Sequence, residues 1–360
     1  MKISCWMTLV DSITLRLKNA AVLAAFLFIA LLTGCLSDIE VQRLTGSTMG
    51  TSWSVAIANP PEFYDQKIIQ SEIEATLSEL NRQMSTYDLN SEISKFNSSD
   101  ANGEWYPVSK LFAMTTSEAL NFSEISRGAF DPTVGPLVNL WGFGTGDSVE
   151  SLPTAETIEG VKAQVGYTAI SVRTSVANGG PAIQKHLSRQ LDLSAIAKGV
   201  GVDQVYQLLD DKGYVNFLVE IGGEVRVKGN KDGLGWTVAI EKPLKGERAV
   251  EQLVSLSDIA LATSGDYRNF REIDGVEYSH TIDPQTGRPV VHQLASVTVA
   301  DKECAIADGW ATTLLVLGPR EGYKLAISHE LAALLIERTS DGYVVTKTPE
   351  YERLFAGGME

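Results

Sequence analysis

The sequence predicts an α+β fold, in which helices and strands occupy separate blocks of one compact unit. Two patterns support this prediction. Apolar residues repeat at helical spacing through much of the first 213 residues, whereas short apolar runs separated by glycine-containing turns begin at residue 217. The last two runs are joined by Asp341-Gly342, a signal of an antiparallel hairpin. Because no proline-rich linker divides the 360 residues, we expect a single unit.

The first block is predicted to be mainly helical. A strand is expected at 53–57, followed by helices at about 69–84, 110–127, 154–165 and 194–213. Ser109 is positioned to cap the second helix, and glycines follow the last three. The face expected to be buried on the first helix repeats at spacings of three and four: Ile69, Ile73, Leu77, Leu80 and Met84.

The second block is predicted to contain most of the strands. Strands are expected at 217–221, 236–240 and 252–262. A long apolar helix follows at 303–317, and Pro319 is expected to begin another helix. The predicted strands at 331–336 and 343–346 complete the unit.

Residues 1–34 have the pattern of an export signal. Arg16 and Lys18 precede an apolar run of 13 residues, which is shorter than the roughly 20 needed to span a bilayer. The run ends in Leu32-Thr33-Gly34-Cys35, which resembles a bacterial lipobox, although a chance triplet is the alternative. We therefore expect removal of residues 1–34, acylation of Cys35 and a mature domain of residues 35–360. This predicts a lipid-anchored protein of the bacterial cell envelope that faces the periplasm, with the inner membrane favoured over the outer.

The chain is acidic. It carries 45 acidic and 30 basic residues, a formal net charge of −15, and loss of residues 1–34 removes a further net +2. This charge excludes a general nucleic-acid binder, which needs a basic surface. An apolar content of 44% argues against disorder. After removal of the signal and acylation of Cys35, Cys304 is the remaining thiol, and we expect it to pack as a small apolar residue.

Asp308 is a candidate metal ligand. It is the only charged residue in the run 305–315, which otherwise has the composition of a buried helix. Thr312 lies four residues later on the same face, and a carboxylate beside a hydroxyl oxygen suits a hard cation such as Mg²⁺. The alternative is an acidic residue that only complements the dipole of the first helical turn.

Two further segments are candidate sites. Residues 192–201 combine a turn, a helix start and Lys198, which together suit an anionic phosphate, although a capped helix with a surface lysine is the commoner explanation. His280 precedes a rigid loop, 283–289, and is the best general-base candidate of the four histidines, with a structural role as the equal alternative. Tyr87 could stack on a planar ligand or pack in the core.

Together these segments resemble the ApbE family of FAD:protein FMN transferases. The matching stretches follow the order of the family and extend from near the expected mature N-terminus to the last long helix: 47–51, 84–87, 128–144, 192–199, 263–268, 280–289 and 307–312.

The resemblance implies a fold and a reaction. The fold would consist of antiparallel sheets flanked by helices. Mg²⁺ would be held by the carbonyl of Ala195 together with Asp308 and Thr312. FAD, the substrate, would be contacted by Met49, Tyr87, Asp131, Lys198 and Ile282, the last through its backbone. A threonine hydroxyl of an acceptor protein would attack the FMN phosphorus with His280 as the base, giving a flavinylated protein and AMP. In this family the acceptors are typically subunits of membrane redox pumps of the NADH:quinone type.

Two other functions remain open at this point. Water could replace the threonine, which would make the protein a Mg²⁺-dependent FAD pyrophosphatase that forms FMN and AMP. The protein could also be a periplasmic lipoprotein that binds flavin without catalysis. Two departures from the family pattern, residues 199–203 and Glu224, leave the details of flavin binding in doubt.

Overall fold

The computed structural model describes residues 39–146, 151–175, 179–231, 233, 235–244, 246–267, 269–273 and 275–356. The chain divides into two compact units, Met1–Glu40 and Val41–Glu360, and the second is described below. The predicted signal segment 1–34 and the predicted lipidation site Cys35 lie outside the described residues. Across the described ranges, no helix combines the length and the apolar character that crossing a membrane requires.

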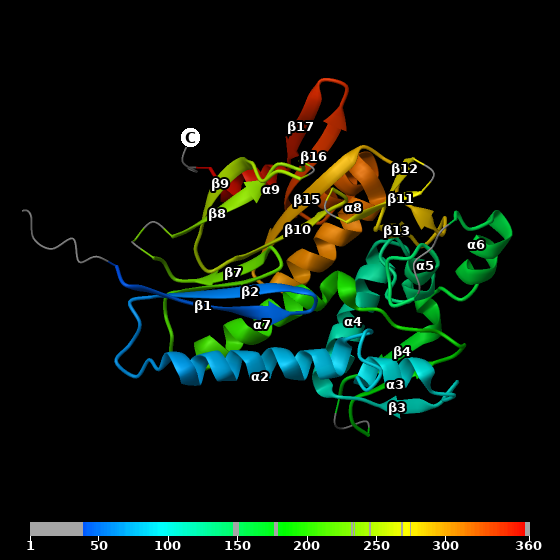
Figure 1. Ribbon diagram of the computed structural model, residues 1–360, viewed down its shortest axis with the longest axis horizontal. Helices are drawn as coiled ribbons and strands as arrows, with labels where there is room; N and C mark the ends of the chain where they lie inside the picture. Colours follow the sequence, from blue (N-terminus) through cyan, green and yellow to red (C-terminus); the bar gives the residue numbers. More distant parts are fainter. Residues whose placement is uncertain are drawn as a thin grey trace, which may run out of the picture. The chain divides into compact units, whose positions relative to one another are not determined.

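An eight-stranded antiparallel sheet forms the centre of the second unit (Figure 1). Its strand order is β1-β2-β6-β7-β10-β15-β16-β17, and every neighbouring pair is antiparallel. This confirms the α+β class with antiparallel sheets. The strands are β1 (Val41–Thr48), β2 (Thr51–Ala58), β6 (Phe217–Ile221), β7 (Glu224–Lys228), β10 (Ala260–Gly265), β15 (Leu294–Asp301), β16 (Ala332–Thr339) and β17 (Gly342–Lys347).

The sheet consists of two halves joined at one narrow seam. Strands β7 and β10 pair through only two residue pairs, Ala260 with Arg226 and Leu261 with Val225. On either side of this seam the neighbouring strands pair over five residues or more. The N-terminal hairpin and β6–β7 therefore form one half, and the strands that follow residue 259 form the other.

Helices α7 (Ser194–Asp211) and α8 (Cys304–Ser328) pack against each other and against the sheet. Helix α7 contacts β6 and β7, whereas α8 contacts mainly β10 and β15 and also reaches β7 and β16, so α8 covers one half of the sheet and crosses its seam. Helix α2 (Gln66–Met84) packs against α7 (Figure 1). It buries the predicted face. Helix α4 (Lys110–Ile125) contacts both α7 and α8, and the predicted Ser109 cap accepts from the N–H of Phe112.

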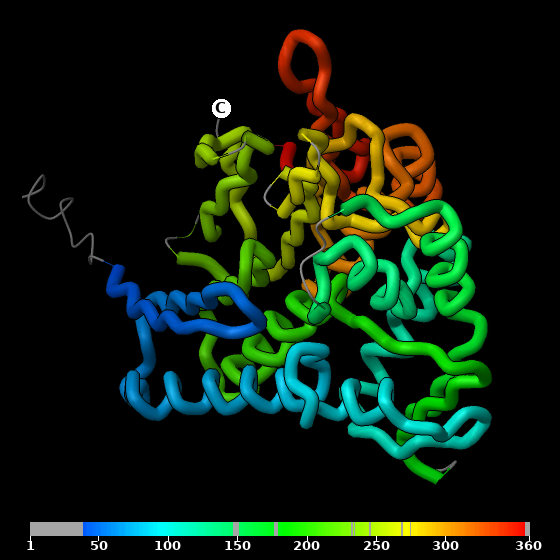
Figure 2. The backbone as a smooth tube through the Cα atoms, turned by 45° about the vertical axis from the view of Figure 1, so that its right-hand side comes forward, coloured from blue at the N-terminus to red at the C-terminus, as the bar shows by residue number. Residues whose placement is uncertain are grey.

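The remaining elements form smaller layers around this core (Figure 2). The small antiparallel sheets are β3-β5-β4 (Trp105–Pro107, Ala182–Lys185, Ile170–Arg173), β8-β9 (Trp236–Glu241, Val250–Leu256), β11-β12 (Phe270–Ile273, Val276–Ser279) and β13-β14 (Ile282–Asp283, Arg288–Pro289). The shorter helices are α3 (Glu92–Ser98), α5 (Gly135–Leu140), α6 (Ala155–Lys162) and α9 (Pro349–Leu354).

One predicted strand is wrong in its extent. The run 252–262 contains the end of β9 and the start of β10, which belong to different sheets. The chain turns between them at Asp258, whose φ of 52° is incompatible with a continuous strand. The predicted helix break near Pro319 is confirmed, because Gly318 has a non-helical φ of 78° within α8.

Candidate active site

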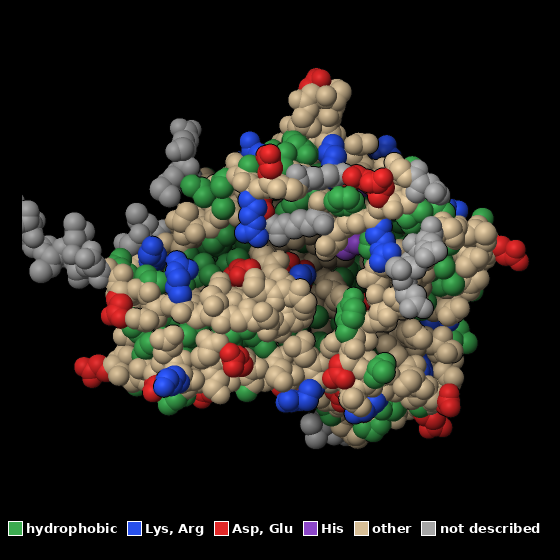
Figure 3. Space-filling model, viewed as in Figure 1, with side chains coloured by type: hydrophobic (Ala, Val, Ile, Leu, Met, Phe, Trp, Pro, Cys, Tyr) green, Lys and Arg blue, Asp and Glu red, His purple; other side chains and the backbone are tan. Residues whose placement is uncertain are grey.

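A cavity of about 1110 Å³ opens between the β1–β2 turn, the start of α7, the middle of α8 and the β12–β13 segment. The face shown in Figure 3 is hollowed at this place, and a histidine is visible in the hollow. Eight of the nine predicted ligand-contacting residues line the cavity. They are Met49, Tyr87, Asp131, Ala195, Lys198, His280, Ile282 and Thr312. The ninth, Asp308, lies beneath its surface and is 1% exposed.

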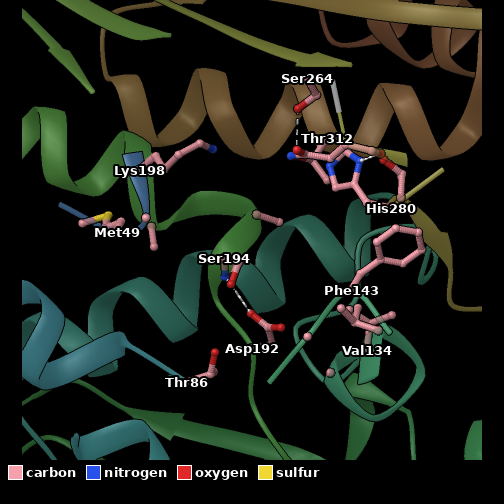
Figure 4. A pocket seen from close by; sticks show the side chains of 18 of the residues that line it. Met49, Thr86, Val134, Phe143, Asp192, Ser194, Lys198, Ser264, His280 and Thr312 are labelled. Atoms are coloured by element: carbon pink, nitrogen blue, oxygen red, sulfur yellow. Dashed lines mark hydrogen bonds between the residues drawn. The ribbon is translucent and has the colours of Figure 1, made fainter. Parts of the chain in front are cut away.

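Lys198 lies between two buried carboxylates. Its Nζ is 3.2 Å from Oε1 of Glu224 and 3.6 Å from Oδ1 of Asp308. Burial favours a lower pKa for Lys198, but the charges of Asp308 and Glu224 outweigh it and hold this pKa above its ordinary value. Lys198 therefore remains a cation, and Figure 4 shows its side chain directed into the cavity.

Glu224 was not predicted as a site residue. It begins β7, is 2% exposed and lines the cavity, and its Oε2 has no hydrogen-bond partner. Burial and the nearby Asp308 raise its pKa well above the ordinary range, although Lys198 opposes this. Burial likewise raises the pKa of Asp308, and Lys198 and the Gly199 N–H partly offset it. The base of the cavity thus holds two carboxyl groups and one ammonium group.

Helices α7 and α8 meet at Gly199. A Cβ atom at this position would lie 2.5 Å from the carbonyl oxygen of Cys304, so only glycine permits this approach. The Gly199 N–H donates to Oδ2 of Asp308 across 3.0 Å. The predicted metal ligands Ala195 and Asp308, on different helices, are brought to one place by this contact.

Asp203 fixes the beginning of α8. The N-cap residue of that helix, Glu303, makes no side-chain capping bond, and the Asp203 carboxylate instead accepts from the N–H groups of Cys304 and Ala305 at 3.0 and 2.9 Å. Arg226 on β7 pairs with Asp203 at 2.6 Å. This capping role gives Asp203, within the segment that departs from the family pattern, a structural explanation. No short-range sequence signal could have indicated it, because the partners are about 100 residues apart.

The predicted metal ligands fit Mg²⁺ in their chemistry. A carbonyl, a carboxylate and a hydroxyl are all hard oxygen donors. Thr312 Oγ1 is 3.0 Å from Oγ of Ser264, a cavity residue that the sequence reasoning also missed (Figure 4). The Gly199 N–H, one turn after Ala195 in α7, donates to Oδ2 of Asp308 and so places this carboxylate beside the start of the helix. Oε2 of Glu224 is buried in the same cavity without a hydrogen-bond partner.

His280 is held as a neutral imidazole with a defined orientation. Its Nδ1 is 2.9 Å from the carbonyl oxygen of Asn269, which can only accept, so Nδ1 carries the proton. Burial lowers the pKa of His280. Nε2 is therefore left as an unprotonated acceptor, as a general base requires. Phe143 lies edge-on to the ring at a centroid distance of 6.4 Å (Figure 4).

The predicted FAD contacts differ in their surroundings. Asp131 lines the cavity, but its carboxylate already accepts from Thr133 N, Thr133 Oγ1 and Tyr167 N at 2.8, 2.6 and 3.0 Å. Tyr87 is 69% exposed and is accessible for stacking. Met49 occupies the two-residue β1–β2 turn, where it and Gly50 have the positive φ values of 49° and 72° typical of a type I′ hairpin. The contacts of Asp131, Tyr87 and Met49 with FAD stay predictions.

Within the described ranges, no three His, Cys, Asp or Glu side chains gather as a metal-binding group. The predicted site depends on carbonyl and hydroxyl oxygens instead. The fold and the cavity thus define a class: an α+β protein with a large ligand cavity that is equipped to bind an anion and to accept a proton.

The chain belongs to the ApbE family, whose model matches residues 49–335. Among curated proteins it is similar to the FAD:protein FMN transferase of Vibrio cholerae serotype O1, at 43% identity over 323 residues, which cover 89% of this chain and 95% of the relative. It is also similar to the FAD:protein FMN transferase of Escherichia coli K12, at 36% identity over 319 residues, covering 87% and 89%.

Solved structures agree with this assignment. The flavin transferase ApbE from Vibrio cholerae superimposes with a TM-score of 0.80 at 41% identity, covering 88% of this chain and 99% of that one. The apo form of the flavinyl transferase ApbE from Pseudomonas stutzeri gives a TM-score of 0.81 at 38% identity, covering 90% and 100%.

Proposed function

We propose that this chain transfers the FMN moiety of FAD to a threonine hydroxyl of an acceptor protein and releases AMP. One observation carries the proposal: the neutral imidazole of His280, the Lys198 ammonium and the hydroxyl of Thr312 all line one cavity. The names of the relatives supply the two substrates, FAD and a protein. The cavity, about 1110 Å³, exceeds the range of roughly 300–1,000 Å³ typical of a pocket for one small ligand.

The chemistry is a phosphoryl-group displacement. The threonine Oγ forms a bond to the FMN phosphorus, and the pyrophosphate bond to AMP breaks, so that AMP leaves with the bridging oxygen. His280 Nε2 accepts the threonine proton as this bond forms. The Asn269 carbonyl, which accepts from Nδ1–H, keeps the ring oriented and stabilises the imidazolium that results.

Lys198 and the start of α7 provide positive potential for the pyrophosphate. Mg²⁺, held by the Ala195 carbonyl, Asp308 and Thr312, would neutralise charge on the pyrophosphate and on the leaving AMP. Met49, Tyr87, Asp131 and the backbone of Ile282 would position FAD. The hydrogen bond between Thr312 and Ser264 orients the side chain of Thr312 among these proposed metal ligands.

The location and the acceptors are part of the same proposal. The lipobox-like segment supports acylation of Cys35 and attachment to the envelope membrane, with the domain of residues 35–360 facing the periplasm. The acceptors would be subunits of membrane redox pumps of the NADH:quinone type. Metabolic labelling with a fatty acid, compared between the parent chain and Cys35→Ala, tests the anchor, and equal labelling of both would exclude it.

The deciding experiment is to incubate residues 36–360 with FAD, Mg²⁺ and the soluble domain of such a subunit, and to weigh the acceptor. We expect a mass gain equal to FMN on one threonine and stoichiometric AMP. AMP without the mass gain would instead identify a pyrophosphatase, and no AMP would leave a flavin-binding protein.

A further inference from the structure

One edge of strand β8 faces the cavity. Four consecutive residues of β8, from Val238 to Glu241, line the cavity, whereas no residue of its partner β9 does so. Successive side chains of a strand point to opposite faces of its sheet, so contact through one face would involve only alternate residues. The lining by consecutive residues indicates that the strand presents its edge.

This edge has no neighbouring strand among the residues that the structure describes. Strand β8 is hydrogen-bonded to β9 alone in a two-stranded sheet. In an antiparallel pair, every second residue directs its N–H and C=O away from the partner strand. Within the run Val238-Ala239-Ile240, the N–H and C=O groups that point away from β9 face the cavity.

The central part of this edge lacks the features that usually prevent strand addition. Natural sheet edges are commonly protected by charged side chains, prolines or bulges. The residues Thr237 to Ile240 include neither a charge nor a proline, whereas Glu241 and the register shift between Ile240 and Glu241 limit the unprotected part at its end. An unprotected edge inside a functional cavity is explained if a polypeptide segment pairs with it.

We propose that the acceptor protein docks by adding an extended segment, which carries the target threonine, to the free edge of β8. This inference rests on the proposed function and specifies its second substrate as an unfolded or exposed strand-like segment. Backbone hydrogen bonds to β8 supply affinity that is largely independent of sequence, and alternate side chains of the segment enter the cavity. A helical segment, about 10–12 Å wide, would not use this edge.

The arrangement also explains how the threonine reaches the reacting phosphorus. Strand β8, His280 and Thr312 line the same cavity, so a segment paired with β8 lies within the enclosure that holds the proposed base. Pairing fixes which side chain of the segment points inward, because a shift by one residue would reverse every side chain. The edge therefore selects one hydroxyl in the acceptor.

The test uses proline at two adjacent positions, Val238→Pro and Ala239→Pro. Adjacent residues direct their N–H groups to opposite sides, so one variant removes a bond to the cavity side and the other removes a bond to β9. We expect the variant that removes the cavity-side bond to raise the KM for the acceptor by about tenfold, with the Kd for FAD and the melting temperature unchanged. Leu253→Pro on β9, opposite Ala239 and outside the cavity lining, is the control for hairpin damage.

Hydrogen exchange gives a readout independent of turnover. The probe is the soluble acceptor domain with its threonine replaced by valine, added to the full mature chain with and without FAD. We expect protection of alternate amides in 238–240 and none of the outer amides of β9. Unchanged exchange in β8, or an unchanged acceptor KM in both proline variants, overturns the docking proposal. Failure of the proposed function would appear differently, as absence of transfer to the unaltered acceptor.

Discussion

The main-chain N–H of Gly199 donates a 3.0 Å hydrogen bond to Oδ2 of Asp308, which joins the start of α7 to the start of α8. The absence of a side chain at position 199 makes this bond possible, because the carbonyl of Cys304 occupies the place of a Cβ. The predicted metal site therefore depends on a packing contact between two helices as well as on its ligands.

Gly199→Ala should separate the two helices. Overpacking of this kind typically costs about 1–3 kcal/mol, and we expect that loss in the free energy of unfolding, measured by urea denaturation. Mg²⁺ affinity should also fall, since Asp308 loses its N–H donor. The matched control is Gly160→Ala in α6, where a Cβ meets no atom within 4 Å. That change should stabilise by about 0.5–1 kcal/mol. Equal effects of the two substitutions would refute the packing argument.

Asp203→Ala should uncap α8. Two N–H groups lose their acceptor and Arg226 loses its partner, so we expect a decrease of about 2 kcal/mol in the free energy of unfolding. Exchange of the Cys304 and Ala305 amides should become faster. Thr154→Ala, which removes the cap of α6, serves as the control with a loss of about 1 kcal/mol and no change in Mg²⁺ binding. Unchanged exchange at Cys304 would contradict the role of Asp203.

His280 should set the acidic limb of the rate profile. Because burial lowers its pKa, the imidazole stays neutral below the ordinary value of about 6.5, and kcat/KM should fall only at lower pH. His280→Ala should reduce kcat by about 10²–10⁴-fold and remove this limb, with FAD affinity little changed. A fall in FAD affinity as large as the fall in rate would identify a structural histidine instead.

Glu224 should make stability depend on pH. Its pKa is raised in the folded state, so the folded protein binds its proton more tightly than the unfolded chain does. Its contribution therefore favours folding most at low pH and is lost as the pH rises from the ordinary glutamate pKa to the raised one. Glu224→Gln should flatten this part of the curve of unfolding free energy against pH. An identical slope in the variant would show that other groups cause it.

Asp308→Asn should abolish the effect of Mg²⁺. The amide preserves shape but removes the charge of the only carboxylate among the proposed ligands, so we expect loss of metal-dependent turnover. Added Mg²⁺ should raise the melting temperature of the parent chain and not that of the variant. Addition of EDTA should bring the parent to the activity of the variant. Full Mg²⁺-dependent activity in Asp308→Asn would exclude the assignment.

Much of the architecture follows from local pattern. The apolar spacing of α2, the Ser109 cap of α4 and the break at Gly318 are visible in the sequence because each involves neighbours within a few residues. The run 252–262 was misjudged because apolar strand-like residues lie on both sides of the short turn at Ser257-Asp258, and the turn contains no glycine or proline to mark it. Strand propensity cannot show where one sheet ends and another begins.

The site was predictable where one helix or one family motif holds its residues. Asp308 and Thr312 share a helical face, and Lys198 lies at a helix start. Glu224, noted only as a departure from the family pattern, and Ser264, within a matching stretch, were given no site role. They lie on β7 and β10, and only the pairing of these distant strands places them near α7 and α8. Long-range register of that kind has no signature in a single sequence.

The two-pair seam between β7 and β10 gives substrate binding a second consequence. Glu224 and Lys198 belong to one half of the molecule, and Ser264 and Thr312 belong to the other. A dinucleotide in the cavity contacts residues of both halves, so its binding free energy should add to the cohesion that the packing of α7 against α8 already provides. FAD should therefore also protect the folded chain, and its addition should raise the melting temperature.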